Sequence, residues 1–465
     1  MKLAFHGAAR TVTGSKHLLT LENNYQILLD CGMFQGLGSR TYTLNANFGF
    51  DPEKISVLLL SHAHIDHSGL IPKLVKEGFK GKIYCTAATK ELTEILLEDS
   101  AHIQSKDKNN NHHPHPSLYE PEDVNTSMEL FEVIEFDKWF NITPDISVLY
   151  TRTGHLIGAA AIHLRVMEDG KVTAISFSAD VGRALPPLLK PATDFPQAEY
   201  IILESTYGDR HHEMTTSNIE VLLQWIKRTC VERKGKLIIP AFSVGRTQEL
   251  LYLLNQLELE KRLPELSYFV DSPLSLKATE SIKKYMDEFN DTLQQILKVD
   301  KDPFVFNGLK YIETVEDSIK LSQHYNEPCV ILSASGTGDA GRVRHHIEHA
   351  AGNPANAILF SGYCSDESLG GILLNGAREI EVYGKTIEVN AEVGQLKGLS
   401  AHGDSDDLCN FVSCQDPGQV RKLFLVHGEF RAQEVLARKL SKKNFHPVVV
   451  PNMHEEFQLN ISASV

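Results

Sequence analysis

The sequence has few of the features that mark secreted or membrane proteins. Its seven cysteines form no CxxC pair and are odd in number, which argues against a disulfide framework and predicts reduced thiols. No apolar run approaches the roughly 18 residues of a membrane span, and the N-terminal MKLAFHGAARTVTGSKH lacks the apolar core of a signal peptide. Biased sequence is confined to SKDKNNNHHPHPSL, Ser105 to Leu118, which predicts a surface loop rather than a metal store. We therefore expect a soluble, cytoplasmic protein without membrane contact.

Basic residues are also fewer than acidic residues. The 465 residues carry 46 lysines and arginines against 60 aspartates and glutamates, a formal net charge of −14. This balance argues against a broad cationic surface that holds nucleic acid by charge alone. It leaves room for a local cationic groove or a bound metal, and the length predicts two large domains.

What the sequence has instead is a set of polar residues at the ends of apolar strands. Short apolar strands alternate with amphipathic helices, which predicts an α/β fold. Seven predicted strands end at or beside a histidine, aspartate or glutamate: QILLD at Asp30, VLLLSHAHIDH at His62 to His67, VLYTRTGH at His155, TAISFSAD at Asp180, YIILEST at Glu204, KGLSAH at His402 and LFLVHGE at His427. Ligands and catalytic groups of α/β folds collect where strands give way to loops.

The HxHxDH string is the most informative of these segments. One histidine or aspartate at a strand end is more often a turn former than a ligand, but imidazole and carboxylate together suit Zn²⁺. The spacing places His62 and His64 on one side and points Asp66 and His67 at a second site about 3.5–4 Å away, as in two-metal hydrolases. A structural zinc site would usually include cysteines, and none of the seven lies in these motifs.

These residues resemble the metallo-β-lactamase superfamily, whose defining string is HxHxDH. Further segments narrow the resemblance to its β-CASP branch of RNA- and DNA-processing nucleases: LESTYG with Glu204, SAH with His402, HGE with His427, PAFSVGRTQELLYLL, DSPLSLKAT and GLSAHGD. The resemblance covers nearly the whole chain. It implies a four-layer αββα sandwich with an inserted parallel-sheet α/β domain, the β-CASP insert. It also implies a compact form, without the N-terminal RNA-binding module of archaeal members or the C-terminal domain of ribonuclease J.

The sequence supports such an insert independently of the resemblance. KLIIPAF, SYFVDS, CVILSAS and AILFSGY are typical of apolar strands followed by Gly/Ser-rich turns, most of which lead into helices. We place the first part of the metallo-β-lactamase domain at 1–206, the insert at 207–378 and the return segment at 379–465. The stretch TIEVNAEVGQLKGLSAH would then lead back into the first domain.

The resemblance implies a role for each site residue. It implies two sets of metal ligands that share Asp180: His62, His64 and His155 for one zinc, and Asp66, His67 and His427 for the other, with Mn²⁺ as an alternative metal. A hydroxide shared by the metals would attack phosphorus, and His402, held by Glu204, would protonate the leaving oxygen. Asp66, Glu204 and His402 form the expected catalytic set. Asp30 would orient a ligand imidazole, although a turn cap before Cys31 also explains an aspartate there.

Contacts to substrate phosphates are expected in the insert. The loop SASGTGDAGRVRHH follows a predicted strand and opens a helix, where backbone amides can hold a phosphate, although such turns are also common for packing reasons. We nominate Ser335, Gly336, Arg246 and Arg342 for this role. His345 and His346 are expected on the polar face of the helix. The chain departs from the family pattern at Thr337, Cys364 and Gly371, all in the expected substrate-facing loops.

Three functions are compatible with these patterns. The first is a zinc-dependent ribonuclease that cuts single-stranded RNA internally, from the 5′ end or both, with RNA held between the two domains and a homodimer as one assembly. DNA remains an alternative substrate, because contacts to the 2′-hydroxyl are not visible in sequence. The second is hydrolysis of a small ester, thioester or phosphodiester on the same metal core, against which Glu204, His402 and the insert argue. The third is a non-catalytic RNA-binding subunit, against which the complete ligand set argues.

Overall fold

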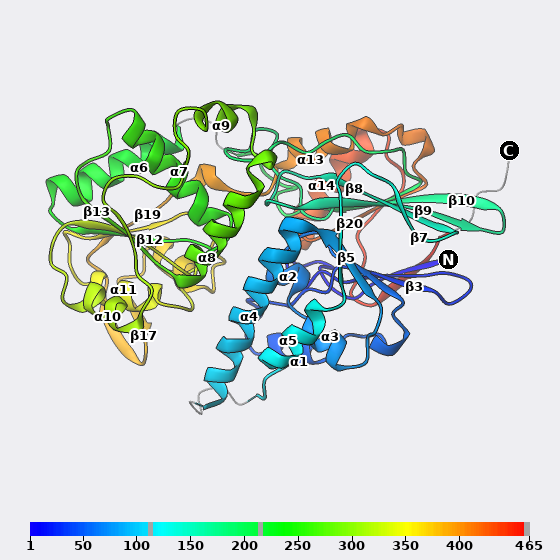
Figure 1. Ribbon diagram of the computed structural model, residues 1–465, viewed down its shortest axis with the longest axis horizontal. Helices are drawn as coiled ribbons and strands as arrows, with labels where there is room; N and C mark the ends of the chain where they lie inside the picture. Colours follow the sequence, from blue (N-terminus) through cyan, green and yellow to red (C-terminus); the bar gives the residue numbers. More distant parts are fainter. Residues whose placement is uncertain (110–114, 213–216, 460–465) are drawn as a thin grey trace. The chain divides into compact units, whose positions relative to one another are not determined.

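The computed structural model describes residues 1–109, 115–212 and 217–459, which divide into two compact units (Figure 1). Unit 1 comprises Met1–His211 and His402–Val465, and unit 2 comprises His212–Ala401. Among the described residues, no helix combines the length and apolarity needed to span a membrane. All seven cysteines are free thiols.

Unit 1 contains two seven-stranded mixed sheets. The first has the order β22 (Glu455–Gln458), β1 (Lys2–Phe5), β2 (His17–Thr20), β3 (Gln26–Leu29), β4 (Val57–Leu59), β5 (Lys82–Thr86) and β6 (Phe131–Ile134). The second has the order β21 (Val448–Val449), β20 (Lys422–Val426), β11 (Tyr200–Glu204), β10 (Lys171–Phe177), β9 (Ala160–Glu168), β8 (Ile146–Arg152) and β7 (Phe140–Thr143).

The two sheets pack face to face because their strands alternate apolar side chains between two faces. Ile27 and Leu29 of β3 point into a core shared with the second sheet, whereas Leu28 points to the opposite face. Helices cover both outer faces: α3 (Ile71–Lys76), α4 (Ala87–Asn109) and α5 (Pro121–Met128) on the first sheet, and α13 (Ser405–Phe411) and α14 (Phe430–Lys442) on the second (Figure 1). The predicted αββα sandwich is therefore confirmed.

Other helices of unit 1 are short. They are α1 (Arg40–Ala46), α2 (Ile65–Ser68) and the 3₁₀ turns η1 (Pro52–Lys54), η5 (Val412–Cys414) and η6 (Pro417–Gln419). Helix α4 extends the regular structure into the segment predicted as a loop at 105–118, while residues 110–114 of that segment lie outside the described residues.

Unit 2 is built on a six-stranded parallel sheet, as the sequence predicts. Its order is β14 (Leu309–Tyr311), β13 (Ser267–Asp271), β15 (Cys329–Ser333), β12 (Lys236–Pro240), β16 (Ala357–Phe360) and β19 (Glu392–Gln395). Its helices are α6 (Asn218–Ile226), α7 (Arg246–Leu259), α8 (Pro273–Ile282), α9 (Asp291–Ile296), α10 (Val315–Gln323), α11 (Val343–Ala350) and α12 (Leu369–Leu374), with the turns η2 (Lys227–Glu232) and η3 (Lys283–Glu288). A hairpin of β17 (Glu379–Val382) and β18 (Lys385–Glu388) completes the unit.

The insert ends later than the sequence suggests. We predicted a return to the first domain from residue 379, but β19 pairs in parallel with β16 and so belongs to the sheet of unit 2. The hairpin β17–β18 packs Ile380, Val382 and Ile387 on the same core. The chain leaves unit 2 only at Ala401, and the difference arises because strand pairing between distant segments is not encoded in local periodicity.

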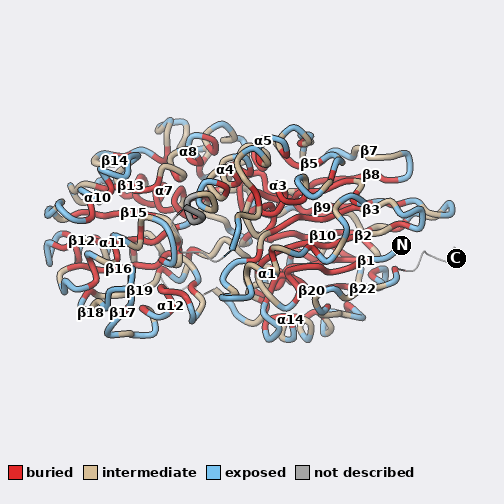
Figure 2. Tube along the Cα trace, turned by 90° about the horizontal axis from the view of Figure 1, so that it is seen from below, coloured by how far each residue is buried: buried red, intermediate tan, exposed pale blue. Residues whose placement is uncertain are grey.

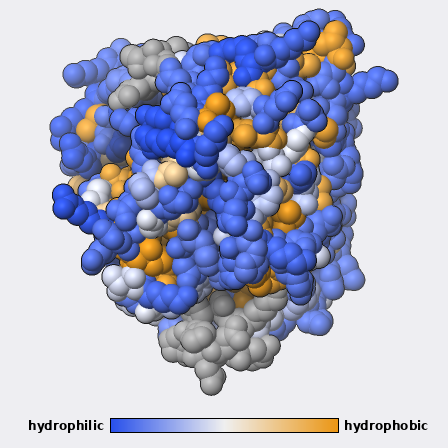
Figure 3. Space-filling model, turned by 90° about the vertical axis from the view of Figure 1, so that its left-hand side faces the viewer, coloured by the Kyte–Doolittle hydropathy of each residue, from blue (hydrophilic) through white to orange (hydrophobic). Residues whose placement is uncertain are grey.

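Burial follows this architecture in both units. The central strands of the sheets are buried along most of their length, whereas edge strands such as β6, β7 and β22 are more exposed (Figure 2). On the face shown in Figure 3, hydrophobic residues form separate small areas within a mostly hydrophilic surface. Scattered apolar residues of this kind are ordinary for a protein surface.

Candidate metal centre

The polar residues singled out in unit 1 follow its strands closely. Asp30 comes directly after β3, His62 and His64 follow β4, and α2 carries Asp66 and His67. On the second sheet His155, Asp180 and His427 follow β8, β10 and β20, and Glu204 is the last residue of β11. The predicted strand KGLSAH is wrong, because Lys397–Leu399 forms the 3₁₀ turn η4 and His402 follows it in a loop.

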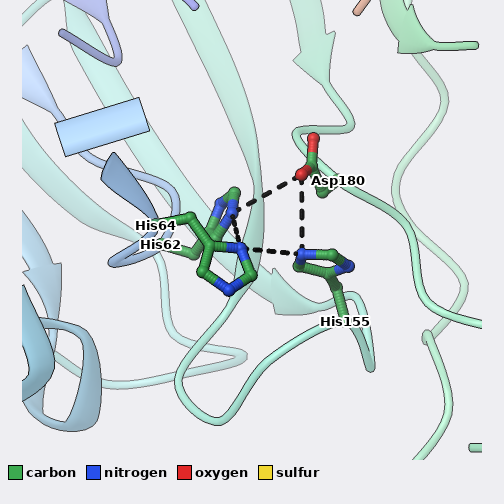
Figure 4. Close-up of side chains that lie close together, drawn as sticks. All are labelled: His62, His64, His155 and Asp180. Atoms are coloured by element: carbon green, nitrogen blue, oxygen red, sulfur yellow. Dashed lines mark hydrogen bonds and ion pairs between the residues drawn. The ribbon is translucent and has the colours of Figure 1, made fainter. Parts of the chain in front are cut away.

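Three imidazoles and one carboxylate face one another in the first group (Figure 4). Nδ1 of His64 lies 3.2 Å from Nε2 of His62 and 3.1 Å from Nε2 of His155. Oδ2 of Asp180 lies 3.6 Å from Nε2 of His62 and 3.5 Å from Nε2 of His155. The four donor atoms all lie within 4.8 Å of one another.

The second group lies on the other side of Asp180. Nε2 of His427 is 3.3 Å from Nε2 of His67 and 3.2 Å from Oδ2 of Asp66. Oδ1 of Asp180 is 3.2 Å from Nε2 of His67 and 3.6 Å from Nδ1 of His427. Asp180 thus offers Oδ2 to the first group and Oδ1 to the second.

The chemistry of these donors fits metal ions. Two ring nitrogens that face each other can share at most one hydrogen. Because three such pairs converge here, hydrogen bonds alone would leave several nitrogen lone pairs facing one another at close range. All ligand candidates except His64 and Asp66 are buried, so solvent does not readily satisfy them. Imidazole and carboxylate donors that converge in this way suit a divalent cation such as Zn²⁺.

Electrostatic interactions within the cluster lower the pKa of some histidines and raise that of another. Burial lowers the pKa of His62 and His155 well below the usual value, which keeps these rings neutral and able to bind metal. Burial also opposes charge on His67, but Asp180, Asp66 and Asp30 outweigh it and raise the pKa of this ring. Burial alone would raise the pKa of Asp66, yet His67 and His427 lower it to about 2, so this carboxyl is ionised.

Asp30 holds one imidazole of the second group. Its Oδ2 accepts from Nδ1 of His67 at 2.7 Å and from Oγ of Ser61 at 2.8 Å, and its Oδ1 accepts from the Ser61 amide at 2.8 Å. Asp30 is fully buried and has a φ of 58°, in the left-handed region. His427 and Ala179, the residue before Asp180, each have a φ of 50°, so three turns at the site hold non-glycine residues in a conformation that costs free energy. These three strained turns therefore support a functional site.

Replacing Asp30 with asparagine distinguishes its two possible roles, which are to orient the imidazole of His67 and to cap the turn before Cys31. Asparagine tolerates the left-handed region as well as aspartate does, so Asp30→Asn preserves the turn and removes the charge that orients His67. We expect zinc affinity, measured by competition with a chromophoric chelator, to fall about 10- to 100-fold. Asp51→Asn, at an exposed cap of η1, is the matched control. Unchanged affinity in Asp30→Asn would leave Asp30 as a turn cap.

His402 and Glu204 form a pair beside both groups. Nδ1 of His402 is 3.2 Å from Oε1 of Glu204, and its Nε2 is 3.9 Å from Oδ2 of Asp180. Oε1 of Glu204 also accepts from the Val181 amide at 2.7 Å, which fixes this buried carboxylate. Burial alone would lower the pKa of His402, but Glu204 and Asp180 outweigh it and raise the pKa to about 9. The ring can therefore carry a proton at neutral pH.

The residues nominated for phosphates lie in unit 2, and the two arginines already have protein partners. Arg342 donates to Oδ1 of Asp271 at 2.7 Å and to the carbonyls of Ile312 and Glu313. Arg246 is buried and pairs with Glu249. Ser335 and Gly336 lie in the loop between β15 and α11. Their phosphate contacts remain predictions.

His346 corrects a further expectation. Sequence placed His345 and His346 together on a polar helix face, but only His345 is exposed. His346 is buried, and its Nε2 lies 2.6 Å from Oδ2 of Asp271, which also accepts from Ser318. A buried carboxylate supplied by β13 thus draws this side of α11 inward.

Two of the three departures from the family pattern, Thr337 and Cys364, lie close to Gly370, the residue before the third. The Gly370 amide donates to the Thr337 carbonyl at 2.9 Å, and a Cβ at Gly370 would lie 2.5 Å from Sγ of Cys364. A Cβ at Gly371 would lie 2.0 Å from the Ser365 carbonyl oxygen, so arginine does not fit there without moving the backbone. The three departures therefore lie near the start of α12 (Leu369–Leu374).

Two residues that hold the site were not singled out in the sequence. Ser61 contacts Asp30 and also lies 3.1 Å from Nδ1 of His62. Oγ1 of Thr206 lies 3.1 Å from Nδ1 of His427. Each sits next to a motif residue, and the need of a ligand imidazole for a partner on its second nitrogen is the signal that could have found them.

Comparison with known proteins agrees with this geometry. Family models match over residues 17–170 (metallo-beta-lactamase superfamily), 247–373 (Beta-Casp domain) and 386–451 (Zn-dependent metallo-hydrolase RNA specificity domain). The chain is 34% identical to a ribonuclease of Thermus thermophilus over 92% of this chain and 93% of that protein. It is 29% identical to an RNase J-like protein of Methanocaldococcus jannaschii over 97% of each chain. It is also 29% identical to transcription termination factor FttA of Methanosarcina mazei, over 94% of this chain and 68% of that protein. The chain therefore belongs to the β-CASP family of metallo-β-lactamase RNA nucleases and is a metal-dependent hydrolase.

Proposed function

We propose that the protein is a two-zinc ribonuclease that hydrolyses phosphodiester bonds of single-stranded RNA. The observation that carries this proposal is the pair of donor groups joined by Asp180, with the His402–Glu204 pair beside them. The similarity to a ribonuclease and to an RNase J-like protein supports RNA as the substrate class. Mn²⁺ is the alternative metal.

Each residue has a proposed task. His62, His64 and His155 hold one metal, Asp66, His67 and His427 hold the other, and Asp180 contributes to both. When bound, such metals activate water at neutral pH and neutralise charge on the phosphate. Asp30 and Thr206 orient the rings of His67 and His427 through their second nitrogens.

The leaving oxygen needs a proton, and in this proposal His402 gives it. Glu204 accepts at Nδ1 and so leaves Nε2, the nitrogen on the side of Asp180, to act as the donor. A ring that is held by a buried carboxylate keeps its orientation through the reaction. Hydrolysis of a small thioester would expel a thiolate, a weaker base that is less dependent on such a donor.

The substrate class is tested by offering the zinc-loaded protein several substrates in parallel. We expect cleavage of 5′-labelled single-stranded RNA, with products that carry 5′-phosphate and 3′-hydroxyl ends, and no turnover of a thioester. Gel separation of the labelled products gives the balance of internal and 5′-end cuts. A DNA oligonucleotide of the same sequence, run alongside, shows how much of the rate depends on the 2′-hydroxyl. Thioester turnover with intact RNA would reject the proposal and favour the small-molecule hydrolase.

A further inference from the structure

Two half-exposed aromatic rings stand at the ends of neighbouring strands in unit 2. Phe242 follows β12 and its residue is 49% exposed, and Tyr363 follows β16 and is 48% exposed. Strands β12 and β16 pair in parallel, so both rings lie at the carboxyl edge of the sheet. Single exposed aromatic residues are ordinary, but two at adjacent strand ends of one sheet edge mark a candidate ligand-binding surface.

The Phe242 ring is closely flanked by two glycines. A Cβ added at Gly336, in the loop after β15, would lie 2.8 Å from Cδ2 of Phe242. A Cβ added at Gly362, after β16, would lie 3.8 Å from Cε2 of the same ring. The ring therefore occupies space that side chains at these two strand ends would otherwise fill.

The backbone beneath this ring is firmly held. The Phe242 carbonyl accepts from the Thr247 amide at 3.2 Å and from its Oγ1 at 2.8 Å, and the Ala241 amide donates to Ser333 at 3.0 Å. Gly245, with a φ of 86°, allows the tight turn from β12 into α7. The exposed ring is thus presented by a fixed loop.

The ring also lies where an open parallel sheet binds its ligands. After β12 the chain crosses towards β13, and after the adjacent strand β16 it continues in the opposite direction towards β19. Helix α11 packs on the face formed by Ile238 and Ile331, while α7 lies over the opposite face (Figure 1). The two connections therefore diverge between β12 and β16, and ligands of such sheets bind in the crevice at such a point.

We propose that Phe242, with Tyr363 at the end of the neighbouring strand, is a platform on which an unpaired RNA base stacks. This inference rests on the proposed function, because single-stranded RNA supplies the ligand. A nucleobase has apolar faces, which stack on aromatic rings, and polar edges. In this proposal the polar edge is met by Ser243, which follows Phe242 in sequence, and by Ser335, which precedes Gly336. Gly336, nominated for a phosphate from sequence, also makes room for the ring.

The test uses Phe242→Leu, which keeps apolar volume and removes the aromatic face. Binding is measured with the zinc-loaded protein in a His402→Ala background, so that RNA stays intact, using single-stranded RNA with 2-aminopurine at successive positions. We expect one position to be quenched on binding by the parent, and Phe242→Leu to lose this quenching and bind about fivefold to a hundredfold more weakly. Phe242→Trp should restore both. Tyr383→Leu is the matched control, because Tyr383 is 46% exposed in the β17–β18 hairpin of the same unit.

Equal binding and quenching in the parent and Phe242→Leu would overturn the proposal, as would an equal loss in Tyr383→Leu. RNA cleavage is also measured with Phe242→Leu in the enzyme that keeps His402. This second measurement distinguishes a failure of the stacking proposal from a failure of the proposed function. If RNA is cut and Phe242→Leu leaves KM unchanged, stacking fails while the ribonuclease assignment stands. If RNA is not cut but is bound with quenching that depends on Phe242, the platform stands and the ribonuclease assignment fails.

Discussion

His402→Ala is expected to lower kcat for RNA cleavage about 100- to 10,000-fold while the protein keeps its metal. The physical reason is the position of the ring. His402 is held through Nδ1 by the buried Glu204, and its Nε2 lies 3.9 Å from Asp180, at the edge of both donor groups. Removing the ring removes the proton donor without removing any proposed ligand.

Metal content is a necessary part of this measurement. His402, Asp180 and His427 also lie close enough to form a metal-binding group of their own. Metal analysis of His402→Ala after gel filtration therefore distinguishes the two roles. A full metal content with lost activity supports the proton donor, whereas loss of one metal would make His402 a ligand and contradict the proposal.

The leaving group provides an independent control. A phosphodiester that expels p-nitrophenolate needs little protonation, so His402→Ala should retain most of its activity on that substrate. Glu204→Gln should behave like a milder form of the same variant, because it keeps a side-chain acceptor for Nδ1 but removes its charge. Equal loss on the activated and the RNA substrate would show that His402 acts through metal binding or folding instead.

The ligand string could be predicted from sequence because its geometry is local. His62, His64, Asp66 and His67 lie within six positions at the end of β4, so the short segment itself brings them together. His155, Asp180 and His427 follow strands whose apolar periodicity is easy to recognise, and strand ends of one sheet edge meet in space. Similarity to a known family then joined segments that spacing alone could not.

The errors arose where a distant partner decides the structure. KGLSAH has the composition of a strand but lies outside the described sheets, and Lys397–Leu399 forms a 3₁₀ turn. β19 was assigned to the first domain because its partner β16 is more than 30 residues away in sequence. His346 was read as exposed because the carboxylate of Asp271 that buries it lies 75 positions earlier. Local patterns do not contain these pairings.

Asp180→Ala is expected to have the most severe effect of any single substitution, because it should empty both metal positions. Asp180 is the one proposed ligand that offers an oxygen to each group: Oδ2 to His62 and His155, and Oδ1 to His67. Zinc content should fall from about two ions per chain to near zero, and RNA cleavage should fall below detection. Metal analysis and the labelled-RNA assay on the same preparation measure both quantities.

The comparison with His64→Ala makes this prediction specific. His64 is proposed as a ligand of the first metal alone, so its loss should cost about one zinc and leave the position formed by Asp66, His67 and His427 loaded. Asp145→Ala, at an exposed carboxylate of the same unit, controls for a general effect of removing negative charge. If Asp180→Ala loses only one zinc, as His64→Ala does, then Asp180 serves a single metal. The two donor groups would then be independent sites, and a mechanism that needs both metals on one phosphate would lose its structural basis.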